Sequence, residues 1–372
     1  MVLIFYSFLV IVIVFLAYVS ESIFNRRTLL EESINLGIPF GYKSRAPIYN
    51  ILLLSSILSL FSAYLGKSGY MIDTVRYAWS FLYRYPMYYD SVNTMISART
   101  EVGFLLINML IGRITHESFW LFLFIAFVTT FINLYTASKI SRKYTLIVFL
   151  YLISLYFFQT TYILRQNLAV SFANLAFLSY TNDLRIRYIM FSLVAITFHA
   201  TALILLPLYF VLKGIKSKKN YYYILMIFSV SFFLFEPIFN LYLPKIPYFG
   251  QLFNTEEANL TFGGGSSSVI FKGVPFYIIT VIALVRRNRL KQIMYKADAF
   301  IACSFFYSMS WLLSYNMYWF FRIGWYFLLP TLALVPSLFS TFKNPRERVI
   351  YYTIFIFVLI FITYRQIVIV FN

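Results

Sequence analysis

The chain has 372 residues, of which 61% are hydrophobic and only 12% are charged, against about 25% charged residues in an average soluble domain. Apolar runs long enough to cross a bilayer recur along the whole sequence, which excludes a soluble protein and predicts an all-α polytopic integral membrane protein. The formal net charge of +18 predicts no nucleic-acid partner, because basic residues of membrane proteins collect in cytoplasmic loops and set the orientation.

Ten segments are predicted to be membrane helices. They are 2–20, 48–66, 118–138, 145–162, 163–180, 221–239, 270–286, 298–315, 319–340 and 348–370. The first lacks the basic region of a cleaved signal peptide, and Arg26 and Arg27 follow its apolar run, so we expect an uncleaved helix with its amino terminus outside. The single cysteine, Cys303, lies in an apolar segment, so no internal disulfide and no thiol-based metal site are expected.

Two further segments do not fit simple spans. Residues 101–114 are too short to cross and are predicted to form a re-entrant or interfacial helix on the outer side. Residues 188–212 have basic flanks at both ends, which predicts two short helices that rise and return, with His199 at the outer tip. In this topology six segments lie on the cytoplasmic side, and together they hold 21 of the 31 Lys and Arg residues. They are 20–47, 139–144, 181–187, 213–219, 286–296 and 343–348. We therefore predict one transmembrane domain over 1–372, with roughly 10–12 transmembrane or re-entrant helices.

Two long loops are predicted to lie outside. The loop 67–100 is rich in tyrosine, with arginines interleaved, and the loop 240–269 ends in the flexible stretch TFGGGSSS. Aromatic rings beside cations offer stacking faces and hydrogen-bond donors for sugars and phosphates. An amphipathic helix lying on the membrane is the alternative interpretation of the first loop.

The topology brings seven polar side chains to the outer membrane surface or just below it. They are Asp73, Arg76, Glu101, Arg165, Gln166, His199 and Arg322. Arg165 begins a helix whose alanines share one face, so it either points into the helix bundle or extends to the outer headgroups. Arg322 lies one turn inside its helix, which favours a functional role; the alternative is an interfacial belt with its aromatic neighbours.

The acidic and histidine candidates also have two interpretations each. A carboxylate at Glu101 is favoured by the dipole of the short helix that it begins, and Asp73 could cap a loop helix. His199 lies at the break of its segment, where a cavity is expected, and a neutral imidazole there could act as a base or a hydrogen-bond donor. The other histidine, His116, is predicted to be a solvated loop residue.

The sequence indicates neither a metal ion nor another cofactor. It has no D-x-D motif and no carboxylate cluster on the predicted outer side, and no glycine-rich phosphate loop that follows a strand. Chemistry outside the membrane without metal or ATP requires a substrate that already carries its activation energy.

Four stretches, in this order, resemble the Wzy-type repeat-unit polymerases, and most closely their EpsG-like branch of capsule and exopolysaccharide polymerases. They are IDTVRYAWSFLYRY, EVGFLLINML, YILRQNLAVSFANLAF and ITFHATALILLPLYFVLKG. The resemblance covers roughly residues 1–340, and its most specific part is the Arg–Gln pair followed by Phe–His in a broken apolar helix. It implies an architecture like that of the GT-C glycosyltransferases and O-antigen ligases. It also implies polymerisation of undecaprenyl-pyrophosphate-linked oligosaccharides at the outer face of the bacterial cytoplasmic membrane, by inverting, metal-independent transfer.

The resemblance also implies roles for the candidate residues. Arg165 and Arg322 would stabilise the pyrophosphate leaving group, because a guanidinium can hold two of its oxygens at once. Glu101 or His199 would deprotonate the acceptor hydroxyl. The predicted substrate-binding residues are Asp73, Arg76, Tyr77, Tyr162, Gln166 and Tyr326; Asp73 is also the third candidate for the base. A flippase and a chain-length regulator are the partners that the family implies.

Two other functions fit the same features. A flippase for lipid-linked oligosaccharides would also need cations in a central cavity, although flippases generally show two similar halves, and this sequence has no internal repeat. An O-antigen ligase would use the same arginine chemistry with a different acceptor. A channel or scaffold is disfavoured by the cations on the predicted outer face.

Overall fold

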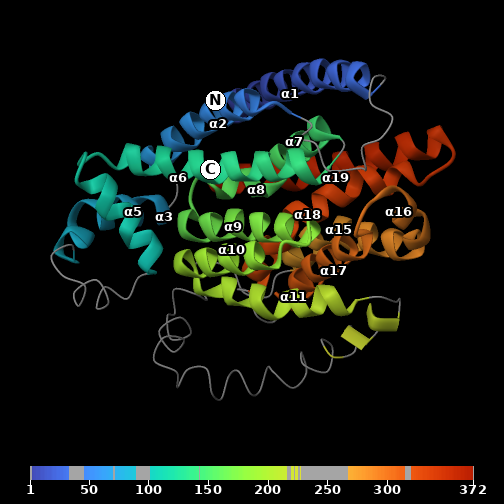
Figure 1. The fold of residues 1–372 in the computed structure, drawn as a ribbon. Coiled ribbons are helices and arrows are strands. Elements are labelled where there is room, and N and C mark those ends of the chain that lie inside the picture. The colour runs from blue at the N-terminus through green and yellow to red at the C-terminus, as the bar shows by residue number, and fades with distance from the viewer. Residues whose placement is uncertain are drawn as a thin grey trace. The chain divides into compact units, whose positions relative to one another are not determined.

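The computed structural model describes residues 2–32, 46–69, 72–88, 101–141, 143–215, 219–221, 223, 224, 227, 267–314 and 320–371, and all the regular elements among them are helices (Figure 1). Five of these helices are long and apolar enough to cross a membrane: Phe5–Ser22, Ile48–Lys67, Ser118–Ile140, Phe320–Ser340 and Pro345–Arg365. Five shorter apolar helices accompany them in the described part. The chain is therefore an all-α polytopic membrane protein, as predicted.

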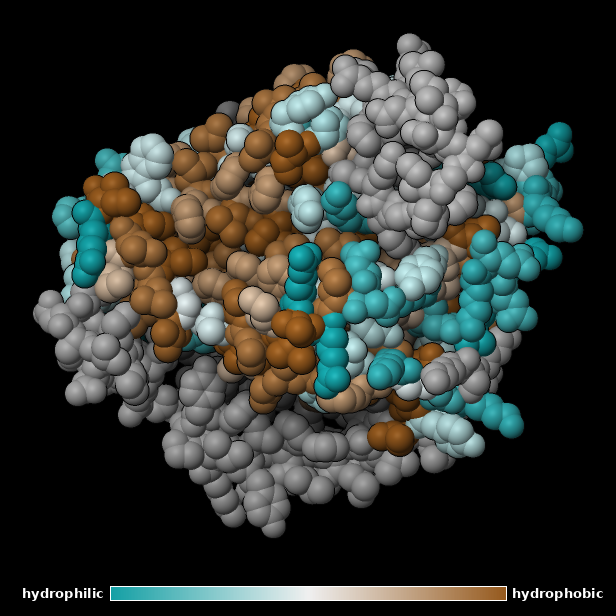
Figure 2. Space-filling view, in the orientation of Figure 1, coloured by the Kyte–Doolittle hydropathy of each residue, from teal (hydrophilic) through white to brown (hydrophobic). Residues whose placement is uncertain are grey.

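The surface of the described helices is unusually apolar. Phe8, Ile11 and Phe15 of the first helix are 62%, 67% and 62% exposed, and Phe357 of the last is 68% exposed. Broad apolar areas cover much of the described surface in Figure 2. Continuous apolar surface of this kind is disfavoured in water but suits contact with lipid chains.

The chain divides into two compact units. The first comprises Met1–Leu206 and Phe342–Asn372, and the second Pro207–Thr341. The elements of the first unit are α1 (Val2–Glu32), α2 (Ile48–Lys67), α3 (Ile72–Trp79), a π-helical turn (Ser80–Arg84), a 3-10 turn (Tyr85–Tyr88), α5 (Val102–Gly112), α6 (Ser118–Ile140), α7 (Tyr144–Ile153), α8 (Leu155–Gln159), α9 (Leu164–Thr181), α10 (Arg185–Phe198), a 3-10 turn (Ala200–Ile204) and α19 (Pro345–Phe371). α11 (Leu205–Gly214) begins at the end of this unit.

Helices α2, α6, α9 and α10 pack side by side in the core of the first unit. Gly66 allows a close approach of α2 to α6, because a Cβ at that position would lie 2.9 Å from the ring of Phe122. Farther along, Asn174 of α9 donates its amide to Asn133 of α6 at 2.9 Å and to the hydroxyl of Tyr156 at 3.0 Å. Buried hydrogen bonds of this kind join helices where water is absent.

The segment predicted as one helix over 145–162 is interrupted, and that prediction was wrong. Ser154 is extended, with φ −85° and ψ 154°, and separates α7 from α8. Its hydroxyl donates to the carbonyl of Tyr151 at 2.9 Å and its amide to Leu150 at 2.9 Å, so local bonds satisfy the broken end. A serine can compete for backbone carbonyls in this way, and the apolar pattern gives no sign of it.

The predicted break in 188–212 is confirmed. α10 ends at Phe198, and His199 is extended, with φ −159° and ψ 124°. The 3-10 turn and α11 follow. The amide of His199 donates to Ala195 at 3.1 Å, and its carbonyl accepts from Ala202 at 3.0 Å, so the backbone remains hydrogen-bonded through the break. His199 consequently lies at a tip between two helical segments.

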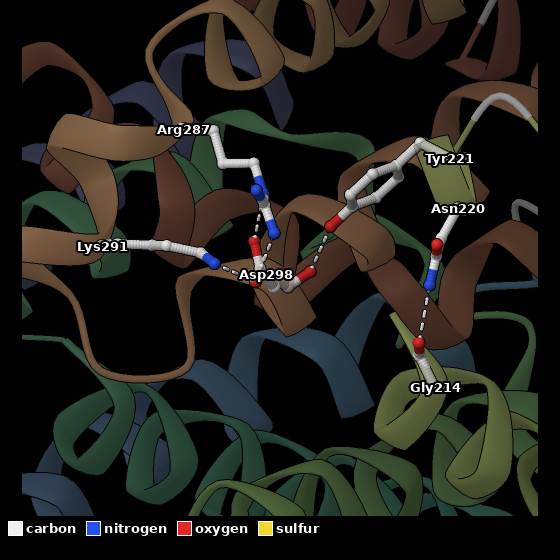
Figure 3. Close-up of polar contacts among 6 residues, drawn as sticks. All are labelled: Gly214, Asn220, Tyr221, Arg287, Lys291 and Asp298. Atoms are coloured by element: carbon white, nitrogen blue, oxygen red, sulfur yellow. Dashed lines mark hydrogen bonds and ion pairs between the residues drawn. The ribbon is translucent and has the colours of Figure 1, made fainter. Parts of the chain in front are cut away.

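The second unit contains α15 (Ser267–Val285), α16 (Arg287–Ile293), α17 (Ala297–Leu313) and α18 (Phe320–Ser340). α17 and α18 approach closely at Gly324, where a Cβ would lie 2.1 Å from the hydroxyl of Ser310. Asp298 joins α16 to α17 (Figure 3): it accepts two bonds from Arg287, at 2.6 and 2.8 Å, and one from Lys291 at 2.8 Å. Tyr221 donates to the Asp298 carbonyl at 2.7 Å.

Most other predicted helices agree with the structure to within a few residues. α1 continues to Glu32, well past the expected end, and α16 was not predicted because its run of basic residues resembles a loop. The predicted helix 221–239 lies almost entirely outside the described residues, as do residues 89–100 and 240–266 of the two predicted outer loops. The single domain over 1–372 stays a prediction.

Candidate active site

A charged cluster joins three helices of the first unit. One oxygen of the Glu101 carboxylate, Oε2, lies 2.6 Å from Nη1 of Arg165, and the other, Oε1, lies 3.3 Å from Nδ1 of His199. The Glu101 side chain is 8% exposed, whereas Arg165 and His199 are 36% and 18% exposed. The carboxylate is therefore buried behind a cation and an imidazole that both retain access to the surroundings.

Glu101 reaches this place because α5 packs tightly against the end of α10. A Cβ on Gly103 would lie 2.5 Å from the hydroxyl of Thr197 and 3.0 Å from the ring of Phe198. Only glycine permits this approach without a shift, and it brings the first turn of α5 beside His199. Glu101 precedes α5 but does not cap it with its side chain, so the carboxylate is available to its two partners.

Arg165 is placed by the turn between α8 and α9. The hydroxyls of Thr160 and Thr161 donate to carbonyls of α8, each at 2.6 Å, and the side-chain amide of Asn167 donates to the carbonyl of Gln159 at 2.5 Å. These bonds close the end of α8 and start α9 at Leu164. Arg165 therefore lies in the first turn of α9, where its side chain meets the start of α5.

Tyr77 of α3 contacts Arg165 through its hydroxyl and its ring. Nε of Arg165 lies 3.5 Å from the Tyr77 hydroxyl oxygen, and its guanidinium carbon lies 5.9 Å from the ring centroid. Phe104 of α5 holds Tyr77 and Tyr85 by edge-on ring contacts, with centroids 5.6 and 6.2 Å apart. Contacts within the described residues thus engage Nη1 and Nε of Arg165.

The electrostatics of the cluster favour an ionised Glu101. Burial alone would raise the pKa of this carboxyl, but the interactions with His199 and with the Arg165 charge outweigh burial and lower the pKa to about 2. A carboxylate with so low a pKa is a weak base at neutral pH. It can, however, hold a guanidinium and an imidazole in fixed orientations.

The other candidates in the first unit differ in how deeply they are buried. Gln166 is buried next to Arg165, and Tyr162 is half-buried in the turn that precedes it. Asp73 is half-buried in the first turn of α3, and Arg76 of the same helix is exposed. Tyr77, by contrast, contacts Arg165 of the Glu101–Arg165–His199 cluster directly. The substrate-binding roles of these residues stay predictions.

The remaining candidates, Arg322 and Tyr326, belong to the second unit. Arg322 is half-buried in the first turn of α18, and Tyr326, one turn later, is 3% exposed. Their roles in the reaction also stay predictions.

Gly103 and Tyr85 were missed by the sequence reasoning. A glycine two residues after a candidate carboxylate, in an otherwise apolar helix, is a signal of close backbone approach that could have identified Gly103. Tyr85 had no signal that separated it from the other tyrosines of 67–100. Among the described residues, no three His, Cys, Asp or Glu side chains gather in a group that could hold a metal ion; metal independence of the reaction stays a prediction.

Comparison with known proteins identifies one family. A model described as the EpsG family matches residues 49–371, which include the whole Glu101–Arg165–His199 cluster and both compact units apart from α1 and the segment before residue 49. No curated protein and no solved structure matches the chain. The implied GT-C-like architecture therefore stays a prediction.

Proposed function

The chain belongs to the EpsG family, and on this premise we propose that it polymerises oligosaccharide repeat units carried on undecaprenyl pyrophosphate. The family indicates an exopolysaccharide-polymerase type of function in polysaccharide biosynthesis. The finer proposal is an inverting, metal-independent glycosyl transfer at the outer face of the bacterial cytoplasmic membrane. The polymer would be a capsular, exopolysaccharide or O-antigen chain.

The observation that carries this proposal is the contact of Glu101 with both Arg165 and His199. The three residues come from sequence positions that are far apart, and each lies at a helix end or break. A cation for a leaving group and a candidate base thus lie on two sides of one carboxylate. Glycosyl transfer from a lipid pyrophosphate needs those two groups.

Arg165 is proposed to stabilise the departing pyrophosphate. Negative charge on the pyrophosphate rises as the bond between the anomeric carbon and its oxygen breaks, so a fixed cation stabilises the transition state more than the ground state. Glu101 and Tyr77 hold the guanidinium before substrate arrives. A preorganised cation of this kind needs little rearrangement during the reaction.

His199 is proposed to be the base, with Glu101 as its positioning residue. If Nδ1 carries the proton toward Glu101, Nε2 has the lone pair that can accept a proton from the acceptor hydroxyl. The acceptor oxygen then bonds to the anomeric carbon from the side opposite the leaving group. The electron pair of the broken bond departs with the lipid pyrophosphate, and the sugar configuration is inverted. The low pKa of Glu101 favours this assignment over Glu101 as the base.

A reconstituted assay tests the proposal. The purified chain, in detergent and with EDTA, would be incubated with a synthetic undecaprenyl-pyrophosphate oligosaccharide, and the products would be separated by length. A ladder whose lengths are multiples of the repeat supports the polymerase. In a parallel reaction that also contains a different lipid acceptor, transfer of only one glycan to that acceptor, without a ladder, would indicate a ligase. Absence of any product, together with substrate movement across liposomes made with the same protein, would indicate a flippase and contradict the proposal.

A further inference from the structure

A pocket lies in the first unit, at the opposite ends of α9 and α10 from the Glu101 cluster. Its volume is about 480 Å³, and it is enclosed by the last turns of α6 and α9, the connection that follows α9 and the first turns of α10. Arg165 and Ser179 are separated by about 20 Å along α9, at a rise of 1.5 Å per residue. This pocket is therefore separate from the candidate active site.

The lining of the pocket has a polar part and an apolar part. The polar part is Lys139, Ser179, Asn182 and Arg187, and the apolar part is Tyr135, Leu175, Leu178, Leu184, Met190 and Phe191. The two cations lie near the ends of their helices, within the last turn of α6 and the first turn of α10. Much of the apolar lining lies one turn farther into the helices. The pocket thus combines two cations with an apolar lining.

The two cations of the pocket are not neutralised by the described part of the chain. Neither Lys139 nor Arg187 lies within ion-pair distance of a carboxylate there, and Nζ of Lys139 lies over the ring of Tyr135, 5.6 Å from its centroid. Arg187 is exposed. Both charges are therefore available to an anion that enters the pocket.

Nor are these cations needed to complete the end of α9. The amide and the side chain of Asn182 both donate to the carbonyl of Leu178, at 3.2 and 2.9 Å. The amides of Asp183 and Leu184 donate to Tyr180 and Ser179, at 3.1 and 2.9 Å. The carbonyls of Leu178, Ser179 and Tyr180 in the last turn of α9 are thus satisfied by the following connection.

We propose that this pocket binds an anionic phospholipid, with the phosphate between Lys139 and Arg187 and part of an acyl chain against the apolar lining. A phosphate accepts charge-assisted hydrogen bonds from both cations. A volume of this size is within the range of ligand pockets and exceeds the need of a lone phosphate. Basic pockets between membrane helices on the cytoplasmic side suit lipid headgroups, and both cations lie in segments that the positive-inside rule makes cytoplasmic.

The test measures lipid binding by the purified full chain. Thermal unfolding and native mass spectrometry would be recorded with phosphatidylglycerol, with phosphatidylcholine and with inorganic phosphate. Phosphatidylglycerol should raise the midpoint of unfolding and remain bound, whereas the other two should have little effect. In the double variant K139Q/R187Q, the affinity for phosphatidylglycerol should fall about tenfold or more, since charge-assisted hydrogen bonds are lost.

Two further variants separate this pocket from charge in general. The variant K139R/R187K keeps both cations and should retain the lipid. The variant K343Q/R346Q removes two exposed cations from another predicted cytoplasmic segment and should also retain it. Equal loss of binding in K343Q/R346Q and K139Q/R187Q would overturn the proposal in favour of unspecific attraction. Equal effects of inorganic phosphate and lipid on the wild type would overturn the lipid assignment.

Discussion

Glu101 keeps its charge in a nearly enclosed position because two neighbours stabilise it. His199 and Arg165 contact different oxygens of the carboxylate, and together they lower its pKa to about 2 against the force of burial. A carboxyl whose pKa is lower in the folded state stabilises the fold when it is ionised. The cluster should therefore contribute to stability as well as to chemistry.

Substitution of Glu101 by Gln tests that contribution through its pH dependence. At pH 7 the wild type should be more stable than E101Q by on the order of 3 kcal/mol, from the gap between the ordinary pKa of 4.5 and the folded value of about 2. The contribution is complete above about pH 4.5 and is lost as the pH falls toward 2. Denaturant unfolding in detergent between pH 7 and 3.5 measures it; a constant difference over that range would argue against an ionised, paired Glu101.

Arg165 is predicted to require a guanidinium and not only a positive charge. R165K should lower the single-turnover rate about 10²–10³-fold, because a lysine cannot hold Glu101 and the leaving group with one planar group. Arg113 is a matched control, since it is exposed at the end of α5 and its side chain has no partner among the residues that the structure describes. A rate for R165K equal to that of R113K would remove Arg165 from the reaction.

At the scale of elements, the approach of α5 to α10 decides where the carboxylate lies. Gly103 lies against Thr197 and Phe198, immediately before His199, so any outward shift of α5 also separates Glu101 from His199. The same approach places Phe104 against Tyr77 and Tyr85. One close contact thus helps to position both partners of the guanidinium.

The variant G103A tests this positioning. An added methyl group would lie 2.5 Å from the Thr197 hydroxyl, so α5 or the end of α10 must shift. A displacement of about 1 Å near a reacting group can cost on the order of 10²-fold in rate. Rate and unfolding midpoint would be compared with those of G214A, where nothing lies within 4 Å of the new Cβ. Alanine favours a helix by about 0.5–1 kcal/mol over glycine, so a lower rate in G103A would not result from weaker helix formation. A rate for G103A equal to that of G214A would contradict the positioning role.

The elements that sequence could predict are those with a strong pattern. The break at His199 follows from an apolar segment whose basic flanks demand that both ends lie on one side, and the short helix after Glu101 follows from its length. The break at Ser154 depends on hydrogen bonds within one turn, and many serines in membrane helices make such bonds without a break. The pattern therefore could not distinguish it.

Contacts between elements were harder to predict than the elements themselves. The topology predicted from the sequence places Glu101, Arg165 and His199 at a similar depth in the membrane. A similar depth does not specify which side chains are in contact. The pairing depends on the packing of Gly103 and on the turn before Arg165, which are local details with no periodicity. The buried hydrogen bond between Asn133 and Asn174 was not predicted, because the sequence does not show that two isolated asparagines in different apolar helices are partners.

For the whole molecule, the orientation in the membrane is the property that decides where the reaction occurs. The charge distribution predicts that the Glu101 cluster faces outward and that the connection between α9 and α10 faces the cytoplasm. The Glu101 cluster lies at one end of α9 and α10, and the proposed lipid pocket lies at the other end. A reversed orientation would move the proposed transfer into the cytoplasm and the lipid pocket to the outer leaflet.

Labelling of single cysteines in intact cells tests the orientation. Cys303 is 1% exposed, so the wild type should give little background with a membrane-impermeant thiol reagent. H116C, in the exposed turn between α5 and α6, should be labelled, and K343C, in the exposed turn before α19, should be labelled only after the cells are opened. Labelling of K343C in intact cells, without labelling of H116C, would reverse the topology.

The most direct test of the central claim compares the two histidines of the chain in one reaction. Wild type, H199A and H116A would each be mixed with a lipid-linked oligosaccharide, and the first new linkage and the released lipid pyrophosphate would be followed by mass spectrometry. We predict one released lipid pyrophosphate per linkage in the wild type and the same rate in H116A. The rate in H199A should be reduced by about 10²-fold or more, because general base catalysis contributes about 10²–10⁴-fold. Equal rates in H199A and H116A would contradict the assignment of the Glu101–Arg165–His199 cluster as the site of transfer.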